Sequence, residues 1–263
     1  MKAHKMVPIS AVIITFNEEH DIERTLAALD FCNEIVVVDS GSNDATEPMC
    51  RKFNCRFMVR PFDGDGPQKR FAISQAVNDW VLIVDADEEV SPELKAEIRS
   101  LFSRTSPDSA GFRVPISLVF MGKLLKHGGE YKKTHLRLFN RMKGNYNTNF
   151  VHGGASVSGK TSTLQNHLLH YSYASLHDYL EKFNAYTSAS AEALFNKKRR
   201  GAVVQSLVRL PLTFIKIYLI KGCFLDGYPG FVWSLLSSFY PVIKFMKLHE
   251  LYNKNTLRPG KEQ

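Results

Sequence analysis

Short apolar runs rich in β-branched residues alternate with helical patterns along the first hundred residues, and this alternation limits the possible folds more than any other feature. The runs that read as strands lie at 9–16, 34–39, 55–62 and 80–90, and the helical patterns between and after them lie at 18–31, 45–53, 66–79 and 91–102. Strands without a polar face that alternate with helices are typical of a parallel sheet covered on both sides. The sequence therefore predicts an α/β fold with a Rossmann-like, mostly parallel sheet and flanking helices.

A cluster of polar residues follows three of these runs, where each strand should end. The clusters are "TFNEE" from Thr15, "DSGSND" from Asp39 and "DADEE" from Asp85. The carboxyl ends of parallel strands lie along one edge of a sheet, and α/β proteins bind their ligands at that edge. The clusters therefore predict a ligand site there, with the alternative that Asp, Asn and Ser serve only as turn formers.

The cluster "DADEE" brings four carboxylates to the end of a buried strand. Asp85 and Asp87 are two residues apart, so in an extended chain they project in the same direction. Such a pair is typical of Mg²⁺ or Mn²⁺ sites, in which one or two carboxylates share the ion with substrate phosphates. The alternative is that these carboxylates only decorate a strand-to-helix turn, where Glu88 and Glu89 favour the start of the next helix. Ser91 is the predicted N-cap of that helix.

The net charge of +8 is unevenly distributed. No Asp or Glu occurs between residues 131 and 177 or between residues 195 and 225, and both stretches carry several Lys and Arg residues. This distribution indicates either an anionic partner, such as nucleic acid, a phosphorylated substrate or a lipid surface, or a solvated basic face. The four cysteines form no CxxC pair, so a reducing compartment is the simpler interpretation.

Four blocks within residues 9–101 resemble a known family when they are taken in order. The blocks are "VIITFNEE", "IVVVDSGSNDAT", "GPQKRFAI" and "WVLIVDADEEVSPEL". They resemble the nucleotide-sugar-binding half of family 2 glycosyltransferases, which have the GT-A fold and invert the anomeric centre. The resemblance implies a nucleotide-sugar donor, a UDP-sugar first, and a divalent metal, Mg²⁺ or Mn²⁺, held by Asp85 and Asp87. The donor-binding residues that it implies in this region are Thr15, Phe16, Asn17, Glu18, Asp39, Ser40, Lys69, Asp85 and Ala86.

Later segments resemble the branch of this family that adds glucose or heptose to the inner core of lipopolysaccharide. The segments are "THLRLFNR" at 134–141, "NFVHGGASV" at 149–157 and the run at 168–194 that begins "LLHYSY". Within the first of them, Arg137 and Arg141 are expected to clamp phosphates of the donor or the acceptor, with the alternative that they face solvent.

An inverting transfer needs a base that removes the proton of the acceptor hydroxyl, and this base is normally a carboxylate. The branch usually has a Glu after the "VH" of the second segment, whereas this chain has Gly153. Between Asp108 and Asp178 the only carboxylate is that of Glu130, which is therefore the first candidate. His152 is the second candidate, with the alternatives that it orients the acceptor or packs in the core.

The composition changes after residue 200. Residues 201–253 are apolar and aromatic, with basic residues spaced among them and prolines at 211, 229 and 241. No uninterrupted apolar run reaches the ~18–20 residues of a membrane-spanning helix. The composition favours amphipathic helices that lie in the headgroup plane of an anionic membrane, with ordinary core helices as the alternative.

Together these patterns predict a GT-A catalytic domain over residues 1–200 and a membrane-associated helical segment at 201–253. Within the catalytic domain, the nucleotide-sugar half is expected at about 9–110 and the acceptor half at about 111–200. The expected enzyme is cytoplasmic, peripheral on the inner face of the cytoplasmic membrane, and acts on a lipid-linked or oligosaccharide acceptor. A polyprenyl-phosphate sugar transferase on the same fold stays an alternative. A nucleic-acid-binding protein is a weaker one, because the usual nucleic-acid-binding motifs are missing from the sequence and paired carboxylates would have no role. We therefore expect no nucleic-acid partner.

Overall fold

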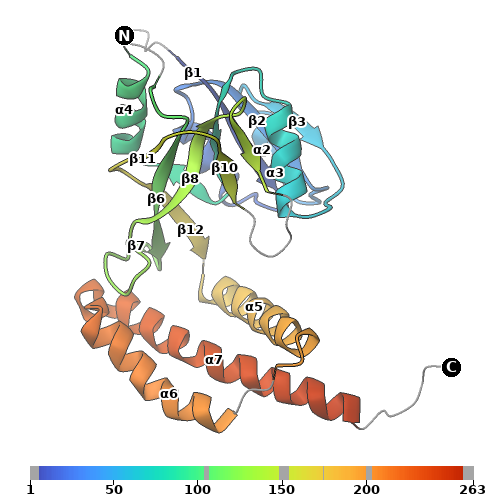
Figure 1. Cartoon of the computed structure of the whole chain (residues 1–263), viewed down its shortest axis with the longest axis vertical. Coiled ribbons are helices and arrows are strands. Elements are labelled where there is room, and N and C mark those ends of the chain that lie inside the picture. The colour runs from blue at the N-terminus through green and yellow to red at the C-terminus, as the bar shows by residue number, and fades with distance from the viewer. Residues whose placement is uncertain (1–5, 104–106, 148–153, 174, 200–202, 257–263) are drawn as a thin grey trace, which may run out of the picture. The chain divides into compact units, whose positions relative to one another are not determined.

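The computed structural model describes residues 6–103, 107–147, 154–173, 175–199 and 203–256, and the chain divides into two compact units. Unit 1 comprises Met1–Leu118 and Lys132–Tyr171, and unit 2 comprises Val119–Tyr131 and Ser172–Gln263. Unit 1 is built around a large sheet, whereas unit 2 is mainly helical (Figure 1). The predicted boundary at residue 200, between a catalytic domain and a membrane-associated helical segment, stays a prediction.

Strands and helices alternate in the first hundred residues of unit 1, as the sequence predicts. In chain order the elements are β1 (Val7–Thr15), α1 (Ile22–Ala28), β2 (Cys32–Asp39), α2 (Thr46–Cys50), β3 (Arg56–Val59), α3 (Asp65–Ser74), β4 (Trp80–Ile83), β5 (Glu88–Val90) and α4 (Pro92–Leu101). They are followed by β6 (Gly111–Phe120), β8 (Lys133–Asn140), β9 (Gly144–Tyr146), β10 (Ala155–Val157), β11 (Thr161–Thr163) and β12 (Leu168–Tyr173). The last residues of β6 and β12 belong to unit 2.

The main sheet has the strand order β3-β2-β1-β4-β8-β6-β12-β5. The strands from β3 to β4 in this order are parallel, whereas β8 is antiparallel to both β4 and β6, and β5 is antiparallel to β12. The register pairs Thr15 with Asp39 and Val12 with Ile83, so β1, β2 and β4 point their carboxyl ends toward one edge. This arrangement confirms the predicted fold class.

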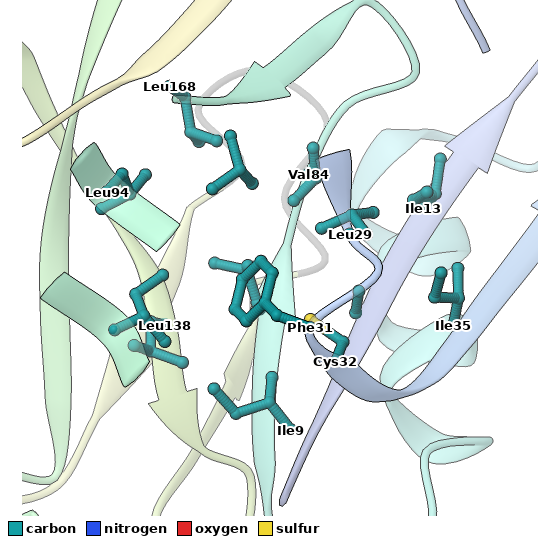
Figure 2. Close-up of a cluster of buried hydrophobic side chains, with 14 of the residues drawn as sticks. Ile9, Ile13, Leu29, Phe31, Cys32, Ile35, Val84, Leu94, Leu138 and Leu168 are labelled. Atoms are coloured by element: carbon teal, nitrogen blue, oxygen red, sulfur yellow. The ribbon is translucent and has the colours of Figure 1, made fainter. Parts of the chain in front are cut away.

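Strand β1 is buried on both faces, which explains its unbroken apolar sequence. Ile9 and Ile13 pack into one hydrophobic cluster, to which α4 adds Leu94 (Figure 2). Val12 packs into a second cluster, to which α3 adds Ile73. Because successive side chains of a strand point to opposite faces, the two clusters lie on opposite sides of the sheet.

The predicted starts of two helices, α4 and α1, have different outcomes. Ser91 caps α4 as predicted, since its hydroxyl accepts the amide of Leu94 at 3.2 Å. The helix expected from residue 18 begins only at Ile22, and the amide of Glu18 donates to the hydroxyl of Thr46 at 2.8 Å. The loop after β1 is thus tied to α2.

The run at 80–90 does not form one strand. β4 ends at Ile83, and the chain turns before β5, with the amide of Glu88 donating to the carbonyl of Asp85 at 3.0 Å. Asp85 and Asp87 therefore lie in a turn and not in an extended strand. Glu88 does not favour a helix start, because it is buried in β5 and bound by Arg137 at 2.8 Å. These two sequence-based expectations are wrong.

Unit 2 contains β7 (Lys123–Leu124), α5 (Leu176–Asn196), α6 (Val203–Ile215), the π-helical turn η1 (Lys216–Ile220), the 3₁₀ turn η2 (Cys223–Asp226) and α7 (Gly227–Thr256). Helix α7 packs against both α5 and α6. Phe120, Tyr173, Tyr179 and Trp233 form an aromatic cluster in this unit, with ring centroids 4.8–6.3 Å apart. Within the described residues, every helix falls short of the length and apolarity that crossing a membrane requires.

Phe31 lies in the first hydrophobic cluster with 0% of its surface exposed (Figure 2). We expect Phe31→Ala to lower the free energy of unfolding by about 3–5 kcal/mol, because it removes a large buried ring and leaves a cavity. Phe62→Ala is the matched control, since Phe62 is 59% exposed, and its effect should stay within about 0.5 kcal/mol. Urea denaturation measures both values, and equal losses would contradict the packing described here.

Candidate functional site

A pocket of about 490 Å³ opens at the carboxyl edge of the parallel strands. It is lined by the last residues of β1, by residues that follow β1, β2 and β4, and by one residue that precedes α3. The lining residues are Ile14, Thr15, Phe16, Glu18, Ser40, Phe62, Asp85, Ala86 and Asp87. All of them except Ile14 and Phe62 belong to the set that the sequence predicts for the donor or the metal. The sequence offers no motif for Phe62, since it stands in an irregular stretch between β3 and α3.

Thr15 has an unsatisfied hydroxyl at this pocket. Its Oγ1 is buried and has no hydrogen-bond partner among the residues that the structure describes. Leaving a buried polar group unpaired costs roughly 1–3 kcal/mol, so such groups are rare in folded proteins. A polar group of a bound ligand would supply the missing hydrogen bond, because Thr15 lines the pocket.

Asn17 and Glu19 join the loop after β1 to the loop after β2. Asn17 has a φ of 55°, a left-handed conformation that Asn tolerates better than most residues, and its side chain accepts the amide of Asn43 at 3.0 Å. Glu19 accepts the amide of Ala45 at 2.9 Å. Asn17 therefore fixes the loop, and its direct contact with a donor stays a prediction.

Asp39 is buried at the end of β2, where its carboxylate shapes its own loop. One oxygen accepts the amides of Gly41 and Ser42 at 2.8 and 2.7 Å, and the other accepts the hydroxyl of Ser42 at 2.5 Å. Turn chemistry, which the sequence left open, accounts for these contacts. The predicted contact of Asp39 with a nucleoside stays a prediction.

Asp85 lies between two cations that approach from other elements. Its Oδ1 is 2.7 Å from Nζ of Lys69 on α3, and its Oδ2 accepts a hydrogen bond of 2.7 Å from Arg137 on β8. Arg137 also donates to Oε1 of Glu88 at 2.8 Å, and Oε2 of Glu88 accepts the amide of Asp85 at 2.9 Å. We call Lys69, Asp85, Glu88 and Arg137 the charge network. It links α3, β8 and the turn between β4 and β5.

The charge network keeps Asp85 ionised. Burial would raise the pKa of Asp85, but the charges of Arg137 and Lys69 outweigh burial and hold this pKa well below its usual range. Burial raises the pKa of Glu88, and the charge of Arg137 opposes it only in part. Burial would lower the pKa of both Arg137 and Lys69. Both pKa values are nevertheless raised, mainly by the negative charge of Asp85. The negative charge of Asp85 is therefore balanced inside the protein.

Asp87 makes a separate pair with His170 on β12. Nε2 of His170 lies 3.2 Å from Oδ2 of Asp87. The backbone fixes this approach, since the amide of Tyr171 donates to the carbonyl of Asp87 at 2.8 Å and His170 pairs with Glu88 across β12 and β5. Burial would lower the pKa of His170, but its hydrogen bond to Asp87 and the neighbouring carboxylates raise it. The sequence analysis assigned no role to His170, although the residue stands in the quoted segment "LLHYSY".

A divalent cation fits this site at Asp87. Both oxygens of Asp85 contact buried cations, whereas Asp87 lines the pocket and contacts His170. Among the described residues, no group of three or more His, Cys, Asp or Glu side chains is arranged to hold an ion. An ion at Asp87 would therefore complete its coordination with oxygens of a ligand and of water, as Mg²⁺ commonly does. The joint role of Asp85 and Asp87 as metal ligands stays a prediction.

Arg137 and Arg141 do not act together at the pocket. Residues four apart on a strand are separated by about 13 Å. Nε of Arg141 donates to the carbonyl of Asn78 at 2.9 Å, and the register of β8 with β4 places this contact beside Trp80 at the start of β4. That end of β4 is opposite to the pocket. The two arginines are therefore apart, because they are spaced along a strand and not along a helix, and the expected contact of each with a phosphate stays a prediction.

Of the two candidates for the catalytic base, the structure describes Glu130 but not His152. Glu130 belongs to unit 2, in the segment between β7 and β8. His152 lies outside the described residues. Both roles stay predictions.

We expect Arg137→Met to lower the free energy of unfolding by roughly 3–5 kcal/mol at neutral pH, because it removes the buried cation that Asp85 and Glu88 share and leaves Asp85 with Lys69 alone. The depressed pKa of Asp85 contributes stability that is present above its unfolded value of 3.8 and is lost as pH falls toward the folded pKa. The gap between variant and wild type should therefore narrow below about pH 4.

Urea denaturation over a pH series measures this gap. Arg51→Met is the matched control, since Arg51 forms an exposed ion pair with Glu47 and its loss should cost no more than about 1 kcal/mol. A small loss for Arg137→Met at every pH would contradict the role of the charge network.

Comparison with known proteins agrees with this architecture. Residues 10–162 match the family model described as "Glycosyl transferase family 2". The chain is 31% identical over 272 residues to an uncharacterized glycosyltransferase of Rickettsia felis, covering 96% of this chain and 94% of that protein. It is 28% identical over 259 residues to the lipopolysaccharide core biosynthesis glycosyltransferase LpsC of Rhizobium meliloti, covering 96% and 94% of the two chains. Among solved structures, TarS 1–349 of S. aureus is similar with a TM-score of 0.47 and 15% identity, covering 94% of this chain and 91% of that one. The family match covers more than half of this chain, which therefore belongs to glycosyl transferase family 2 and is a glycosyltransferase.

Proposed function

We propose that this glycosyltransferase moves a sugar, with inversion, from a nucleoside diphosphate sugar to a lipopolysaccharide core or related glycolipid acceptor. UDP is the first choice for the nucleotide. The observation that carries the proposal is the pocket at the carboxyl edge, which combines exposed aromatic rings, carboxylates and a buried hydroxyl that has no hydrogen-bond partner in the described part of the chain. A nucleoside diphosphate sugar has a group suited to each of these features.

The aromatic rings suit the base of the nucleotide. Phe16 and Phe62 line the pocket and are 56% and 59% exposed, so their faces are open to a ligand. Stacking of a base on such a ring typically contributes about 1–3 kcal/mol to the binding free energy, and it occurs with any of the bases. The hydroxyls of Thr15 and Ser40 then lie in the same pocket for the polar edges of the base or ribose.

The carboxylates suit the diphosphate end of the donor. A divalent ion, Mg²⁺ or Mn²⁺, held at Asp87 would neutralise charge that develops on the leaving diphosphate. Asp85 stands beside that position, and Lys69 and Arg137 hold it there. Lys69 and Arg137 also bring positive charge close to the site, and this favours an anionic ligand.

The transfer itself is a single displacement. The oxygen of the acceptor hydroxyl forms a bond to the anomeric carbon while the bond from that carbon to the diphosphate oxygen breaks. A general base takes the hydroxyl proton, and Glu130 is our first candidate for this base, with His152 the second. The electron pair of the broken bond leaves with the nucleoside diphosphate.

The acceptor proposal rests on a relative and on the surface of unit 2. LpsC, which aligns over nearly the whole chain, is named for lipopolysaccharide core biosynthesis. Unit 2 exposes a run of large apolar side chains from α6 to the start of α7. They are Leu207, Val208, Leu212, Ile215, Leu219, Ile220, Phe224, Leu225, Tyr228 and Phe231. Basic residues flank this run, so we propose that it rests on the anionic inner face of the cytoplasmic membrane, where a lipid-linked acceptor is found.

We expect UDP, with Mn²⁺ or Mg²⁺, to raise the melting temperature of the full chain in a panel of nucleoside diphosphates, because a ligand that binds only the folded state stabilises it. The double variant Phe16→Ala/Phe62→Ala should bind UDP about 5–150-fold more weakly, which corresponds to the loss of one stacking contact.

Met142→Ala is the matched control for these two rings, since Met142 is an exposed apolar side chain that does not line the pocket. No thermal shift with any nucleoside diphosphate would contradict the proposed function. Unchanged affinity in the double variant would contradict only the stacking of the base.

We expect Glu130→Gln to lower turnover by about 10²-fold or more with little change in donor affinity, because a general base acts on the transition state. Glu181→Gln is the control, since Glu181 is an exposed glutamate of the same unit. Steady-state kinetics with a glycolipid acceptor measure both constants. If His152→Ala loses turnover and Glu130→Gln does not, then our first candidate is wrong.

We expect the full chain to pellet with vesicles of phosphatidylcholine that contain an anionic lipid, and to pellet less as salt is added or the anionic lipid is removed. The double variant Ile220→Glu/Leu225→Glu should weaken binding by about tenfold or more, because it removes two large apolar side chains from the contact. Met142→Glu, an exposed site in unit 1, should bind like the wild type. Equal and negligible pelleting with neutral and anionic vesicles would contradict membrane association.

A further inference from the structure

Unit 2 contains a second pocket, of about 280 Å³, between helices α5 and α7, which pack against each other (Figure 1). This volume is close to the lower end of the range of about 300–1,000 Å³ that small-molecule sites span, so the pocket accommodates one ring-sized group. Every described residue of its lining belongs to unit 2. Most of them are aromatic: Tyr173 at the end of β12, Tyr179, Phe183 and Tyr186 on α5, and Trp233 and Tyr240 on α7.

The lining favours a neutral ligand. Among the described residues, it includes no charged side chain and no Leu, Ile, Val or Met. A pocket for a lipid chain is expected to use such aliphatic side chains. Aromatic cages also bind ammonium groups, but here Nζ of Lys182 lies 5.8 Å from the centre of the Tyr173 ring, and its positive charge repels a cation. The pocket is therefore suited to an uncharged ligand that has both apolar faces and polar edges.

Hydrogen bonds between the two helices hold the pocket in shape. The hydroxyl of Tyr240 on α7 donates to the carbonyl of Tyr186 on α5 at 3.2 Å, and it also lies 2.8 Å from the hydroxyl of Ser190. Nζ of Lys247 on α7 donates to the carbonyl of Asn184 on α5 at 2.7 Å. Because these bonds join the helices directly, binding of a ligand requires little further ordering of side chains.

Pro241 adds a hydrogen-bond acceptor to the pocket. Proline has no amide hydrogen, so Pro241 leaves the carbonyl of Ser237 without the helical bond that a residue four positions later normally supplies. Ser237 and Pro241 both line the pocket. Burial raises the pKa of Tyr179 to about 12, although its side-chain hydrogen bond with Ser237 lowers it, so this phenol stays protonated at neutral pH. Hydroxyl groups and a carbonyl therefore stand beside the aromatic faces.

We propose that this pocket binds one neutral sugar ring of the acceptor. The C–H groups on the faces of a sugar ring carry partial positive charge and are attracted to the negative faces of aromatic rings. The hydroxyls at the edge of the sugar exchange hydrogen bonds with the polar groups of Ser237 and Tyr179. An acidic or phosphorylated sugar does not fit, because the described lining has no cation to pair with its charge. The role in acceptor binding rests on the proposed function, whereas the binding of a sugar does not.

The test observes the pocket through its own tryptophan. The chain contains Trp80, buried in unit 1, and Trp233, so labelling of the full chain with fluorotryptophan gives one ¹⁹F resonance for each. Trp233→Phe assigns the two resonances. We expect at least one of methyl glucoside, methyl galactoside and methyl mannoside to shift the Trp233 resonance in a saturable way and to leave that of Trp80 unchanged. Cyclohexanol, a ring with a single hydroxyl, and tetramethylammonium should bind more weakly than that glycoside.

Tyr186→Leu should weaken glycoside affinity about 2–12-fold, because it replaces an aromatic face with an aliphatic side chain. Tyr186 is 56% exposed, so this change leaves the fold intact. Tyr186→Phe, which keeps the ring, should bind like the wild type. Tyr228→Leu is the matched control, since Tyr228 is a 69% exposed tyrosine at the start of α7. In steady-state kinetics, Tyr186→Leu should raise the KM for a glycolipid acceptor by a similar factor and leave donor affinity unchanged.

The outcomes separate this inference from the proposed function. The absence of a saturable shift of the Trp233 resonance with all three glycosides would overturn the inference. Equal or tighter binding of cyclohexanol or tetramethylammonium would overturn it as well, because neither probe has the hydroxyls of a sugar. Glycoside binding with an unchanged acceptor KM in Tyr186→Leu would overturn the role in acceptor binding. Glycoside binding without UDP binding in the thermal-shift panel would overturn the proposed function and leave the sugar site standing.

Discussion

The buried contact of Arg137 with Asp85 and Glu88 is the interaction on which the site depends. It bonds the turn after β4 to β8, and Lys69 adds α3 to the same network. Buried charges are stable only when they are paired and hydrogen-bonded, and here each carboxylate has its partner. The chain therefore turns at Asp85, where an apolar strand would otherwise continue into β5. The turn presents Ala86 and Asp87 to the pocket.

Because of this network, neighbouring carboxylates have different roles. Asp85 and Glu88 form ion pairs with the buried Arg137, and Asp39 accepts hydrogen bonds from the amides of its own loop. These contacts fix the loops that surround the pocket. The pocket lining also includes the hydroxyl of Thr15, the exposed rings of Phe16 and Phe62, and Asp87. A site whose supporting residues are held by packing and hydrogen bonds can bind and orient a substrate without rearranging.

Much of the fold could be predicted from the sequence, because its strongest signals are local. Unbroken β-branched runs such as that of β1 indicate a two-sided sheet, and Ser91 before Pro92 indicates the start of α4. Most of the residues that line the pocket could also be predicted, because the carboxyl ends of parallel strands lie along one edge of the sheet. Pairings between distant segments were not predictable: Arg137 with Glu88, and His170 with Asp87, are separated by 49 and 83 residues. The spacing of Arg137 and Arg141 also could not show whether they lie together. Residues four apart share one face of a helix, but on a strand they are about 13 Å apart.

A crystal structure of the chain with UDP and Mn²⁺, with anomalous scattering recorded for Mn²⁺, tests the central claim most directly. We expect UDP in the pocket at the carboxyl edge, with its base stacked on Phe16 or Phe62. A polar group of UDP should form a hydrogen bond with the hydroxyl of Thr15. The anomalous peak should lie beside Asp87, with Asp85 still bound to Arg137 and Lys69. UDP bound elsewhere, or a metal that displaces Arg137 from Asp85, would contradict the claim that the charge network builds the donor site.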